Sequence, residues 1–373
     1  MKRRLGVFVF YDAQGYVGDY IEYLLQDVKA QLQYLIVVCN GILSEDGKRT
    51  FAKYADEIIM RPNIGFDAGA YREIIKKIYD EGIVENYEEL LLFNDTFFGP
   101  FYPFADIFSD MAKKDVDFWG ISYHQSEYIP RHIQSYFMNF GPGILKSGNL
   151  YDFFNNLNMD EHNVLSVIAH MEFVLTEYLE EAGFSWATYV ERNVGVRLYY
   201  YPHEFLANDK LPILKVKTFG LSSEIDPEIV KSVKYLRERN LYDINLIEKQ
   251  IWHKFQRRLS GYQESGNAES FLPVPTTDLE GIKVFSKLHS GVYIYGAGFY
   301  GSIIMRHIGQ ENVRGYIVSD DRYTVDSYEG MKVYKISQID DRESGIVVAL
   351  KAEYTQEVKG ILEGFRNVLY LWK

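Results

Sequence analysis

Cysteine is nearly missing from this chain, because Cys39 is the only one in 373 residues. A single thiol allows no disulfide within the chain and no Cys-x-x-Cys metal motif, so the cysteine usage fits a reducing compartment. Cys39 ends the apolar run Tyr34–Cys39, which is typical of a small buried hydrophobic residue. We therefore expect a cytoplasmic protein.

The chain also lacks an excess of positive charge and long apolar runs. The formal net charge is -12, which argues against bulk binding to nucleic acid, because that requires a basic face. No stretch reaches the roughly 20 apolar residues that span a bilayer. The run Val7–Phe10 near the start is too short for the apolar region of a signal peptide, so a first strand is the better interpretation.

Aromatic residues, by contrast, are abundant, with 31 Tyr and 24 Phe. Tyrosine-lined clefts suit sugar recognition because rings stack on sugar faces while hydroxyls form hydrogen bonds. A core rich in tyrosine explains the same count equally well. The 47% hydrophobic and 25% charged residues are ordinary for a globular protein, and the length allows two domains.

Strand and helix patterns alternate along the first half, which predicts an α/β fold with a mainly parallel sheet and helices on both faces. Ligands sit at the carboxyl ends of the strands in such sheets, so the loops after strands are the places to search. The apolar spacing predicts strands at Leu5–Tyr11, Tyr34–Cys39, Glu57–Met60, Glu89–Phe93, Asp117–Ser122 and Phe137–Leu145, the last interrupted by Gly141-Pro142-Gly143. It predicts helices at Asp19–Ala30, Ser44–Tyr54, Ala68–Glu81, Tyr151–Asn156, His170–Ala182 and Ile229–Leu259, the last with a break near Tyr242-Asp243.

The first candidate loop is Arg61–Glu73, where Asn63, Gly65 and Asp67 lie between a strand and a helix. Small residues there let the backbone approach a ligand closely, and the helix start favours a phosphate. A plain turn with Asp67 as the helix cap is the simpler alternative.

The second candidate loop follows the strand Glu89–Phe93 and begins with Asn94 and Asp95. Oxygen ligands at that point could hold a divalent cation, Mn²⁺ or Mg²⁺, against a diphosphate. One carboxylate is a weak metal signal, and a polar turn before Gly99-Pro100 accounts for the residues equally well. Asp95 is the candidate metal ligand.

The third candidate is Glu172, which we expect at the start of the helix His170–Ala182. Its carboxylate could take the proton from an acceptor hydroxyl. A carboxylate at a helix start is more often only a partner of the helix dipole.

Together these segments resemble the rhamnan synthesis protein F family, over roughly Met1–Leu259. The combination of the Arg61–Glu73 motif with the Asn94-Asp95-Thr96…Gly99-Pro100 motif is specific, whereas either alone would be weak. The other matching segments, in the same order, are Phe10–Gly15, Val37–Asn40, Asp117–Ser122 and Ile133–Phe140.

The resemblance implies a glycosyltransferase with a GT-A-like domain that acts in the synthesis of rhamnose-containing cell-wall and surface polysaccharides. The implied donor is a nucleotide sugar such as dTDP-rhamnose, and the implied acceptor is a growing lipid-linked glycan at the inner face of the plasma membrane. Transferases of this type end a strand in an Asp-x-Asp metal motif. Here the strand ends in Asn94-Asp95-Thr96, so one expected carboxylate is missing.

The same resemblance implies roles for single residues. Inverting transferases of this type carry a catalytic carboxylate about eleven residues before a Gly-aromatic pair, which makes Glu172, before Gly183, the candidate base. Asn63 and Asp67 would bind the donor. The loop residues Arg131, His132 and Gln134 would contact the pyrophosphate or the acceptor, although an ordinary surface loop is an equal alternative.

A second βαβ pattern opens at Val292 and carries Gly296, Gly298 and Gly301 between a strand and a helix, which is the context of a dinucleotide fingerprint. Asp320 follows the next strand, at a distance that suits a ribose. We expect a glycosyltransferase domain at 1–259, a linker at 260–285 and a small Rossmann-like domain at 286–373. Ligand binding and a purely scaffolding role both remain open for the second domain.

Two alternatives accompany the transferase hypothesis, and a membrane contact is a separate question. A transferase fold that has lost activity could scaffold other polysaccharide enzymes. An NAD-linked enzyme centred on Gly296–Gly301 is disfavoured because no catalytic His, Lys or Tyr-x-x-x-Lys pattern accompanies the loop. The segment Lys249–Leu259 mixes Trp252 with basic residues and resembles an interfacial amphipathic helix, although a core-facing helix with a solvated basic side explains it more simply.

Overall fold

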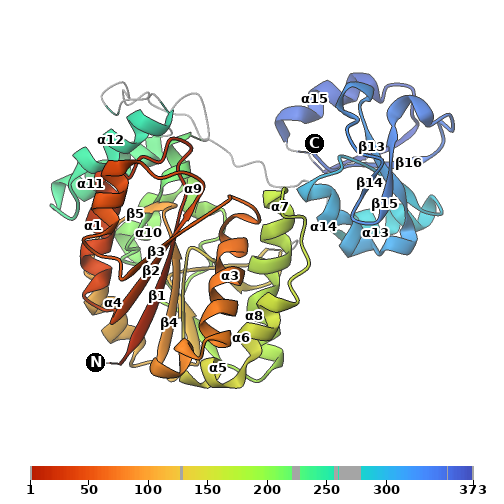
Figure 1. Ribbon diagram of the computed structural model, residues 1–373. Coiled ribbons are helices and arrows are strands. Elements are labelled where there is room, and N and C mark those ends of the chain that lie inside the picture. The colour runs from red at the N-terminus through yellow and green to blue at the C-terminus, as the bar shows by residue number, and fades with distance from the viewer. Residues whose placement is uncertain are drawn as a thin grey trace. The chain divides into compact units, whose positions relative to one another are not determined.

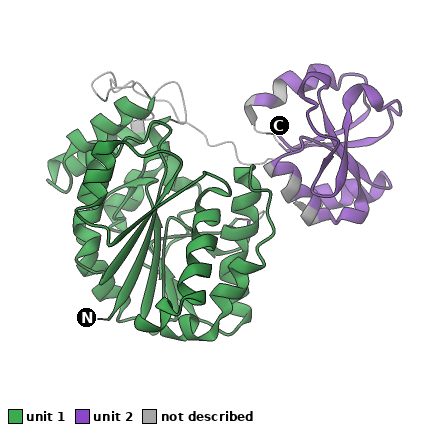
Figure 2. Ribbon diagram, in the orientation of Figure 1, with its two compact units in different colours: residues 1–126, 130–268 green, residues 127–129, 269–373 purple. Residues whose placement is uncertain are grey.

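A computed structural model describes residues 2–126, 129–220, 227–255, 259, 279–350 and 352–371. The chain divides into two compact units, of which the first is Met1–Ser126 with Pro130–Ala268 and the second is mainly Glu269–Lys373 (Figure 2). The expected linker at 260–285 and the basic end of Lys249–Leu259 lie largely outside the described residues.

A seven-stranded sheet in the order β10-β6-β9-β4-β1-β2-β3 forms the centre of the first unit (Figure 1). Only β9 runs antiparallel to its neighbours β4 and β6, so the predicted α/β fold with a mainly parallel sheet is confirmed. The strands are β1 (Arg4–Phe10), β2 (Tyr34–Asn40), β3 (Glu57–Arg61), β4 (Glu89–Asn94), β6 (Phe118–Gly120), β9 (Phe137–Phe140) and β10 (Trp186–Thr188). Two short pairs join β5 (Phe97–Phe98) to β11 (Leu214–Lys215) and β7 (Tyr123–His124) to β8 (His132–Ile133).

Alternating side chains of the central strands build a core on each face of this sheet. Phe8 and Phe10 of β1 belong to one buried cluster, whereas Val7 and Val9 belong to the other, as the two-residue period of a strand requires. On the Phe8 side lie α1 (Asp19–Lys29), α4 (Phe104–Met111), α11 (Pro227–Glu238) and α12 (Ile244–Phe255). On the Val7 side lie α3 (Phe66–Asp80), α5 (Pro142–Ser147), α6 (Asn149–Asn155) and α8 (Phe173–Glu181) (Figure 1).

The parallel strands bring their carboxyl ends to one edge of the sheet. Val9 of β1 pairs with Asn94 of β4, and Cys39 of β2 pairs with Phe10 of β1. Cys39 is buried, as expected. Since β9 runs antiparallel, its first residue, Phe137, pairs with Phe93 at this same edge. The remaining helices are α2 (Glu45–Phe51), α7 (Val164–Val167), α9 (Arg197–Tyr200) and α10 (Pro202–Asn208).

One predicted strand is shorter than expected, and one predicted helix break is confirmed. The strand expected over Phe137–Leu145 ends at Phe140 and does not resume after the interruption, because Gly141 caps α5 and Pro142 takes its first turn, where the missing N–H of proline costs nothing. The helix expected over Ile229–Leu259 breaks before Ile244 into α11 and α12, as expected near Tyr242-Asp243, and the turn between them holds Asn240 at a left-handed φ of 51°.

The second unit has its own six-stranded sheet, in the order β14-β15-β13-β12-β16-β17. All its pairings are parallel except that of β14 with β15. Its strands are β12 (Val292–Tyr295), β13 (Val313–Val318), β14 (Ser327–Tyr328), β15 (Met331–Lys335), β16 (Gly345–Val348) and β17 (Asn367–Tyr370), and its helices are α13 (Leu279–Leu288), α14 (Phe299–Ile308) and α15 (Ala352–Ile361). From β12 the chain adds β13 and β15 on one side of the sheet and then β16 and β17 on the other. This reversal creates a topological switch point, as in doubly wound folds, at the carboxyl end of β12.

None of the helices in the described parts of the chain has both the length and the apolar character needed to cross a membrane.

Gly69 of α3 tests how tightly the loop after β3 packs on its own helix. A Cβ at Gly69 would lie 2.3 Å from the carbonyl oxygen of Ile64, so we expect Gly69→Ala to lower the free energy of unfolding by about 1–3 kcal/mol. Gly143→Ala in α5 is the matched control, because its Cβ would meet only ordinary contacts at 3.5 Å or more and alanine favours a helix by about 0.5–1 kcal/mol. Urea unfolding of the full chain measures both, and equal stability of the two variants would contradict the tight packing.

Candidate functional site

The carboxyl end of β4 connects directly to the first turn of α3. The side-chain amide of Asn94 donates a hydrogen bond to Asp67 Oδ2 at 2.7 Å, and Asn94 Oδ1 accepts one from the hydroxyl of Thr96 at 2.6 Å. Asn94 is buried, whereas Asp67 keeps partial exposure to solvent. Two of the loops predicted from the sequence therefore meet through a single side chain.

This contact explains why an amide stands at position 94. An amide has donors and an acceptor, whereas an ionised carboxylate only accepts hydrogen bonds. An acid at position 94 would repel Asp67, and nearby like charges disfavour ionisation. Asp67 and Asp95 are thus the acidic pair of this edge, and Asn94 links the strand to one of them. Asp67 does not cap its helix, since Gly65 takes the cap position without a side-chain bond.

Asp95, like Asp67, is a carboxylate that resists ionisation. Burial is the main cause that raises the pKa of Asp67 to about 6, against the hydrogen bond from Asn94 and the charge of Lys215. Burial also raises the pKa of Asp95 to about 7, with a further contribution from Asp67, while Lys254 and the Tyr11 N–H oppose it. Perturbed carboxylates grouped at the carboxyl edge of a sheet are typical of functional sites.

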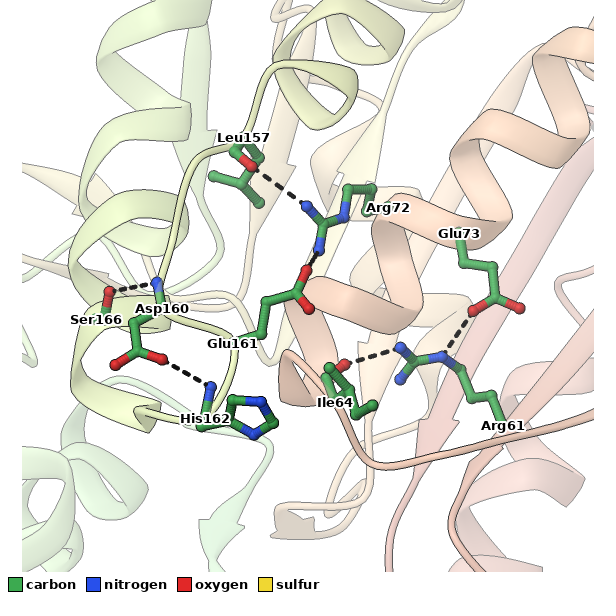
Figure 3. A network of polar contacts seen from close by, with 9 residues as sticks. All are labelled: Arg61, Ile64, Arg72, Glu73, Leu157, Asp160, Glu161, His162 and Ser166. Atoms are coloured by element: carbon green, nitrogen blue, oxygen red, sulfur yellow. Dashed lines mark hydrogen bonds and ion pairs between the residues drawn. The ribbon is translucent and has the colours of Figure 1, made fainter.

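Two arginines fix the loop between β3 and α3 (Figure 3). Arg61, at the end of β3, donates to the Ile64 carbonyl at 2.8 Å and to Glu73 of α3 at 2.8 Å. Arg72 of α3 donates to the Leu157 carbonyl at 3.2 Å and pairs with Glu161. Arg61 therefore joins the loop to α3, and Arg72 joins α3 to the segment that precedes α7.

Asn63 carries an unsatisfied acceptor inside this loop. Its Oδ1 is buried and has no hydrogen-bond partner among the described residues. Buried polar atoms are nearly always paired, so an orphan in a candidate site is notable. Gly65, which follows it, has a left-handed φ of 72° and donates its N–H to the Glu161 carbonyl at 2.9 Å.

Glu172 lies inside a helix rather than at the start of one, which corrects the expectation from the sequence. The helical segment begins with α7 and passes through a π-helical turn, η2 (Ile168–Glu172), before α8 continues it. Such π turns recur at functional sites because the extra residue changes the direction of nearby side chains.

The Glu172 carboxylate is held by donors from the loop that precedes β9. Its Oε2 accepts from both the backbone N–H, at 3.0 Å, and the hydroxyl of Ser135. Its Oε1 lies 3.4 Å from His132 Nε2, an ion-pair distance when the imidazole is protonated. Burial alone would raise the pKa of Glu172, but His132 and Ser135 outweigh it and hold the pKa at about 2. Glu172 is therefore ionised at neutral pH.

The other loop residues predicted to meet a ligand lie behind or beside this site. His132 is fully buried, and its Nδ1 bonds to the Pro130 carbonyl at 2.7 Å, so it supports Glu172 from within. Gln134 is buried and accepts a hydrogen bond from Ser122 at 2.7 Å. Arg131 is exposed and stacks over Trp186 at 4.4 Å. The structure does not gather these three residues into one contact surface.

Lys215 of β11 belongs to the site and was not predicted. Its Nζ donates to Thr96 Oγ1 at 2.5 Å and lies 4.4 Å from the centre of the Tyr136 ring. Burial lowers the pKa of Lys215 to about 8, although Glu172, Asp67 and Asp95 act in the opposite direction. The only hint in the sequence is a lysine inside an otherwise apolar run.

The deciding comparison concerns the first unit. The sequence pattern described as rhamnan synthesis protein F matches residues 35–272, which is more than half of the chain. The chain belongs to the rhamnan synthesis protein F family. This confirms the resemblance inferred from the motifs.

The curated relatives of this family member are remote, and each match covers only part of both chains. An uncharacterised protein of Sinorhizobium fredii is 27% identical over 172 residues, covering 43% of this chain and 44% of the relative. A protein of Vibrio anguillarum named virulence protein VirA is 29% identical over 189 residues, covering 49% of this chain and 58% of the relative. The chain thus spans about half the length of the curated relatives it matches.

Similarity to solved structures is weaker still. A cytidylyltransferase from Leptospira borgpetersenii is 11% identical with a TM-score of 0.33, covering 66% of this chain and 97% of the other. Core-mannan synthase A of Aspergillus fumigatus, in its Mn/GDP form, is 9% identical with a TM-score of 0.31, covering 50% of this chain and 73% of the other. Likeness at this level supports no conclusion about function.

The glycine loop of the second unit lies outside the residues that match the rhamnan synthesis protein F family. Gly296 follows β12 with a left-handed φ of 116°, and a Cβ at Gly301 would lie 2.2 Å from the Gly296 carbonyl oxygen. These glycines therefore allow the turn and the close packing of α14 on it. Gly298 caps α14, and Asp320 accepts a hydrogen bond from the Ser337 N–H at 3.2 Å. Nucleotide binding at this loop stays a prediction.

The hydrogen bond between Asn94 and Asp67 can be tested by placing a second carboxylate at position 94. In the absence of divalent cations, Asn94→Asp replaces a donor with a second carboxylate, so we expect the free energy of unfolding to fall by about 1–3 kcal/mol at pH 8. The folded pair would hold a proton that the unfolded chain releases, so the loss should shrink as the pH falls to 5.

The matched control is the double variant Asn94→Asp/Asp67→Asn, which restores one amide and one carboxylate in exchanged positions. It should recover most of the stability at pH 8 in urea unfolding. A single variant as stable as the original protein at pH 8 would contradict the assigned role of Asn94.

Proposed function

We propose that the first unit transfers a sugar from a nucleotide-sugar donor to an acceptor hydroxyl. The observation that carries this proposal is the convergence of Asp67, Asp95 and Glu172 at the carboxyl edge of the sheet. Family membership supports it, because the family is described as a rhamnan synthesis protein.

The proposed reaction exchanges two bonds at the anomeric carbon of the sugar. The acceptor oxygen forms a bond to that carbon, and the bond from carbon to the diphosphate oxygen breaks with its electron pair left on the diphosphate. The acceptor hydroxyl loses its proton. Two needs follow, namely a base for the proton and positive charge beside the departing diphosphate.

Glu172 is our proposed base. His132 and Ser135 keep its carboxylate ionised and fixed in position, and its side chain keeps 18% exposure to solvent, so a substrate proton can reach it. The same donors make it a weak base. It would therefore accept the proton late, when the acceptor oxygen has already become acidic by bonding to the anomeric carbon.

Asp67 and Asp95 suit a divalent cation that arrives together with the diphosphate. Among the described residues, no group of three or more His, Cys, Asp or Glu side chains could hold a metal on its own. Mg²⁺ commonly binds through one or two carboxylates plus substrate phosphates, and two half-buried carboxylates that resist ionisation form such a set. When bound, the cation would neutralise charge on the diphosphate.

The finer assignments rest on the family description. Rhamnose is our leading choice for the sugar, a growing lipid-linked glycan for the acceptor, and the cytoplasmic face of the plasma membrane for the location. An inactive scaffold is the weaker alternative, because the bond from Asn94 to Asp67 explains why an amide stands at this position. Asn63 and Gly65 would bind the donor beside these carboxylates.

A thermal-shift panel of nucleotide sugars tests the proposal. A donor at about 100 times its dissociation constant should stabilise the fold by about 2.7 kcal/mol, hence by several degrees. We expect Mg²⁺ or Mn²⁺ alone to give no shift, because the carboxylates need the diphosphate to complete the cation site. One nucleotide sugar with the cation should give the full shift, and Asp95→Ala should abolish it.

Gly298→Val is the control in the second unit. A Cβ there meets no atom within 4 Å, and the backbone of Gly298 is extended at a φ of -163°, so valine should be tolerated while it fills the space before α14. The nucleotide-sugar shift should survive this variant. If NAD(H) or a mononucleotide is the only ligand that shifts the protein, and Gly298→Val abolishes that shift, the transferase proposal is wrong.

A further inference from the structure

A single buried lysine reaches the carboxylate cluster from the strand pair β5–β11. Lys215 is 5% exposed, and β11 is held against β5 by antiparallel pairing of Lys215 with Phe97. The Val216 N–H also donates to the Thr96 carbonyl at 3.0 Å. The backbone on both sides is therefore fixed, and the ammonium has little freedom to turn away.

The Lys215 ammonium has more donors than acceptors. It carries three N–H bonds, and its one hydrogen bond to a described residue goes to Thr96 Oγ1. The face of the Tyr136 ring offers a cation–π contact on another side. No ion pair within 4.0 Å joins Lys215 to any carboxylate in the described parts of the chain. Two of its N–H groups thus have no hydrogen-bond acceptor among the described residues.

The charged groups that face Lys215 come from every neighbouring element. Asp67 lies on α3, Asp95 follows β4 and Glu172 lies in the π turn, and all three favour the charged lysine. Lys217, two residues further along, opposes it. The three carboxylates thus act on the ammonium through charge, without an ion pair to it.

A buried ammonium without an ionic partner is costly for the folded state. A neutral side chain at position 215 could pack beside Tyr136 without that cost, and the single bond to Thr96 does not need a charge. Groups kept in such an unfavourable state are characteristic of functional sites. The two remaining donors would be satisfied by oxygens of an anionic ligand.

We propose that Lys215 binds the diphosphate of a nucleoside diphosphate through two of its oxygens and stabilises the charge left there when the sugar departs. This inference rests on the proposed function and adds a residue that the motifs do not contain. Lys215 is anchored on the β11 side, while Asp67 and Asp95 hold the accompanying cation on the other. The diphosphate would lie between the protein's own positive charge and the bound one.

Titration calorimetry with UDP, GDP and dTDP, each with Mg²⁺, tests the proposal on the full chain. For the nucleotide that binds, we expect Lys215→Met to weaken the affinity about 10- to 100-fold, as the loss of hydrogen bonds to a charged group predicts. Lys215→Arg should retain more of the affinity. Lys234→Met, at an exposed position of α11, is the matched control and should bind like the original protein.

The pH dependence of binding separates a binding role from a structural one. Lysine loses its charge as the pH rises, so the affinity of the original protein should fall between pH 8 and 9.5, above the pKa of about 8 for Lys215 and where Asp95, with a pKa of about 7, is already ionised. In Lys215→Met this fall should disappear. Melting temperatures of the variants without ligand show whether each one is folded.

The outcomes distinguish this inference from the proposed function. If no nucleoside diphosphate binds the original protein, the proposed function fails and this inference with it. If one binds, but Lys215→Met folds and binds it equally well, only the inference about Lys215 is overturned. If Lys215→Met does not fold, an affinity of the original protein that stays constant from pH 8 to 9.5 overturns it instead.

Discussion

The hydrogen bond from Asn94 to Asp67 is the constraint on which the site depends. It joins the end of the central strand β4 to the first turn of α3, and it fixes the carboxylate of Asp67 next to Asp95. Thr96 extends the same chain of contacts to Lys215, because its hydroxyl donates to Asn94 and accepts from the ammonium. Four polar side chains thus share one connected network at the carboxyl edge.

Charge is distributed unevenly over this network. Glu172 is held ionised by His132 and Ser135, whereas Asp67 and Asp95 resist ionisation and Lys215 resists protonation. These opposing preferences disappear if an anion and a cation enter together, since each new charge meets its opposite. A diphosphate accompanied by a divalent cation has that composition, which is why a nucleotide-sugar transferase accounts for the geometry better than a scaffold does.

Much of the fold could be predicted because hydrophobic periodicity identified the strands and most helices, and parallel strands place their following loops together. The parallel arrangement therefore predicts from the sequence that Asp67 and the Asn94-Asp95 pair lie at one edge of the sheet. It could not show the π turn at Glu172, which breaks the periodicity by one residue, or the inward direction of His132 and Gln134. Lys215 was missed because β11 is two residues long and its contact with Thr96 spans 119 residues. The break between α11 and α12 was expected near Tyr242-Asp243, whereas the left-handed backbone of Asn240 within it follows from no side-chain pattern.

We propose that this member of the rhamnan synthesis protein F family turns over a nucleotide sugar at Asp67, Asp95 and Glu172. The most direct measurement is the release of nucleoside diphosphate from a panel of UDP-, GDP- and dTDP-sugars, with and without glycan acceptor. We expect the original protein to release nucleoside diphosphate from one donor, and to release more of it when acceptor is present. Asp95→Ala should lose both the release and its increase with acceptor. Release that is absent with every donor and acceptor, or unchanged in Asp95→Ala, would contradict it.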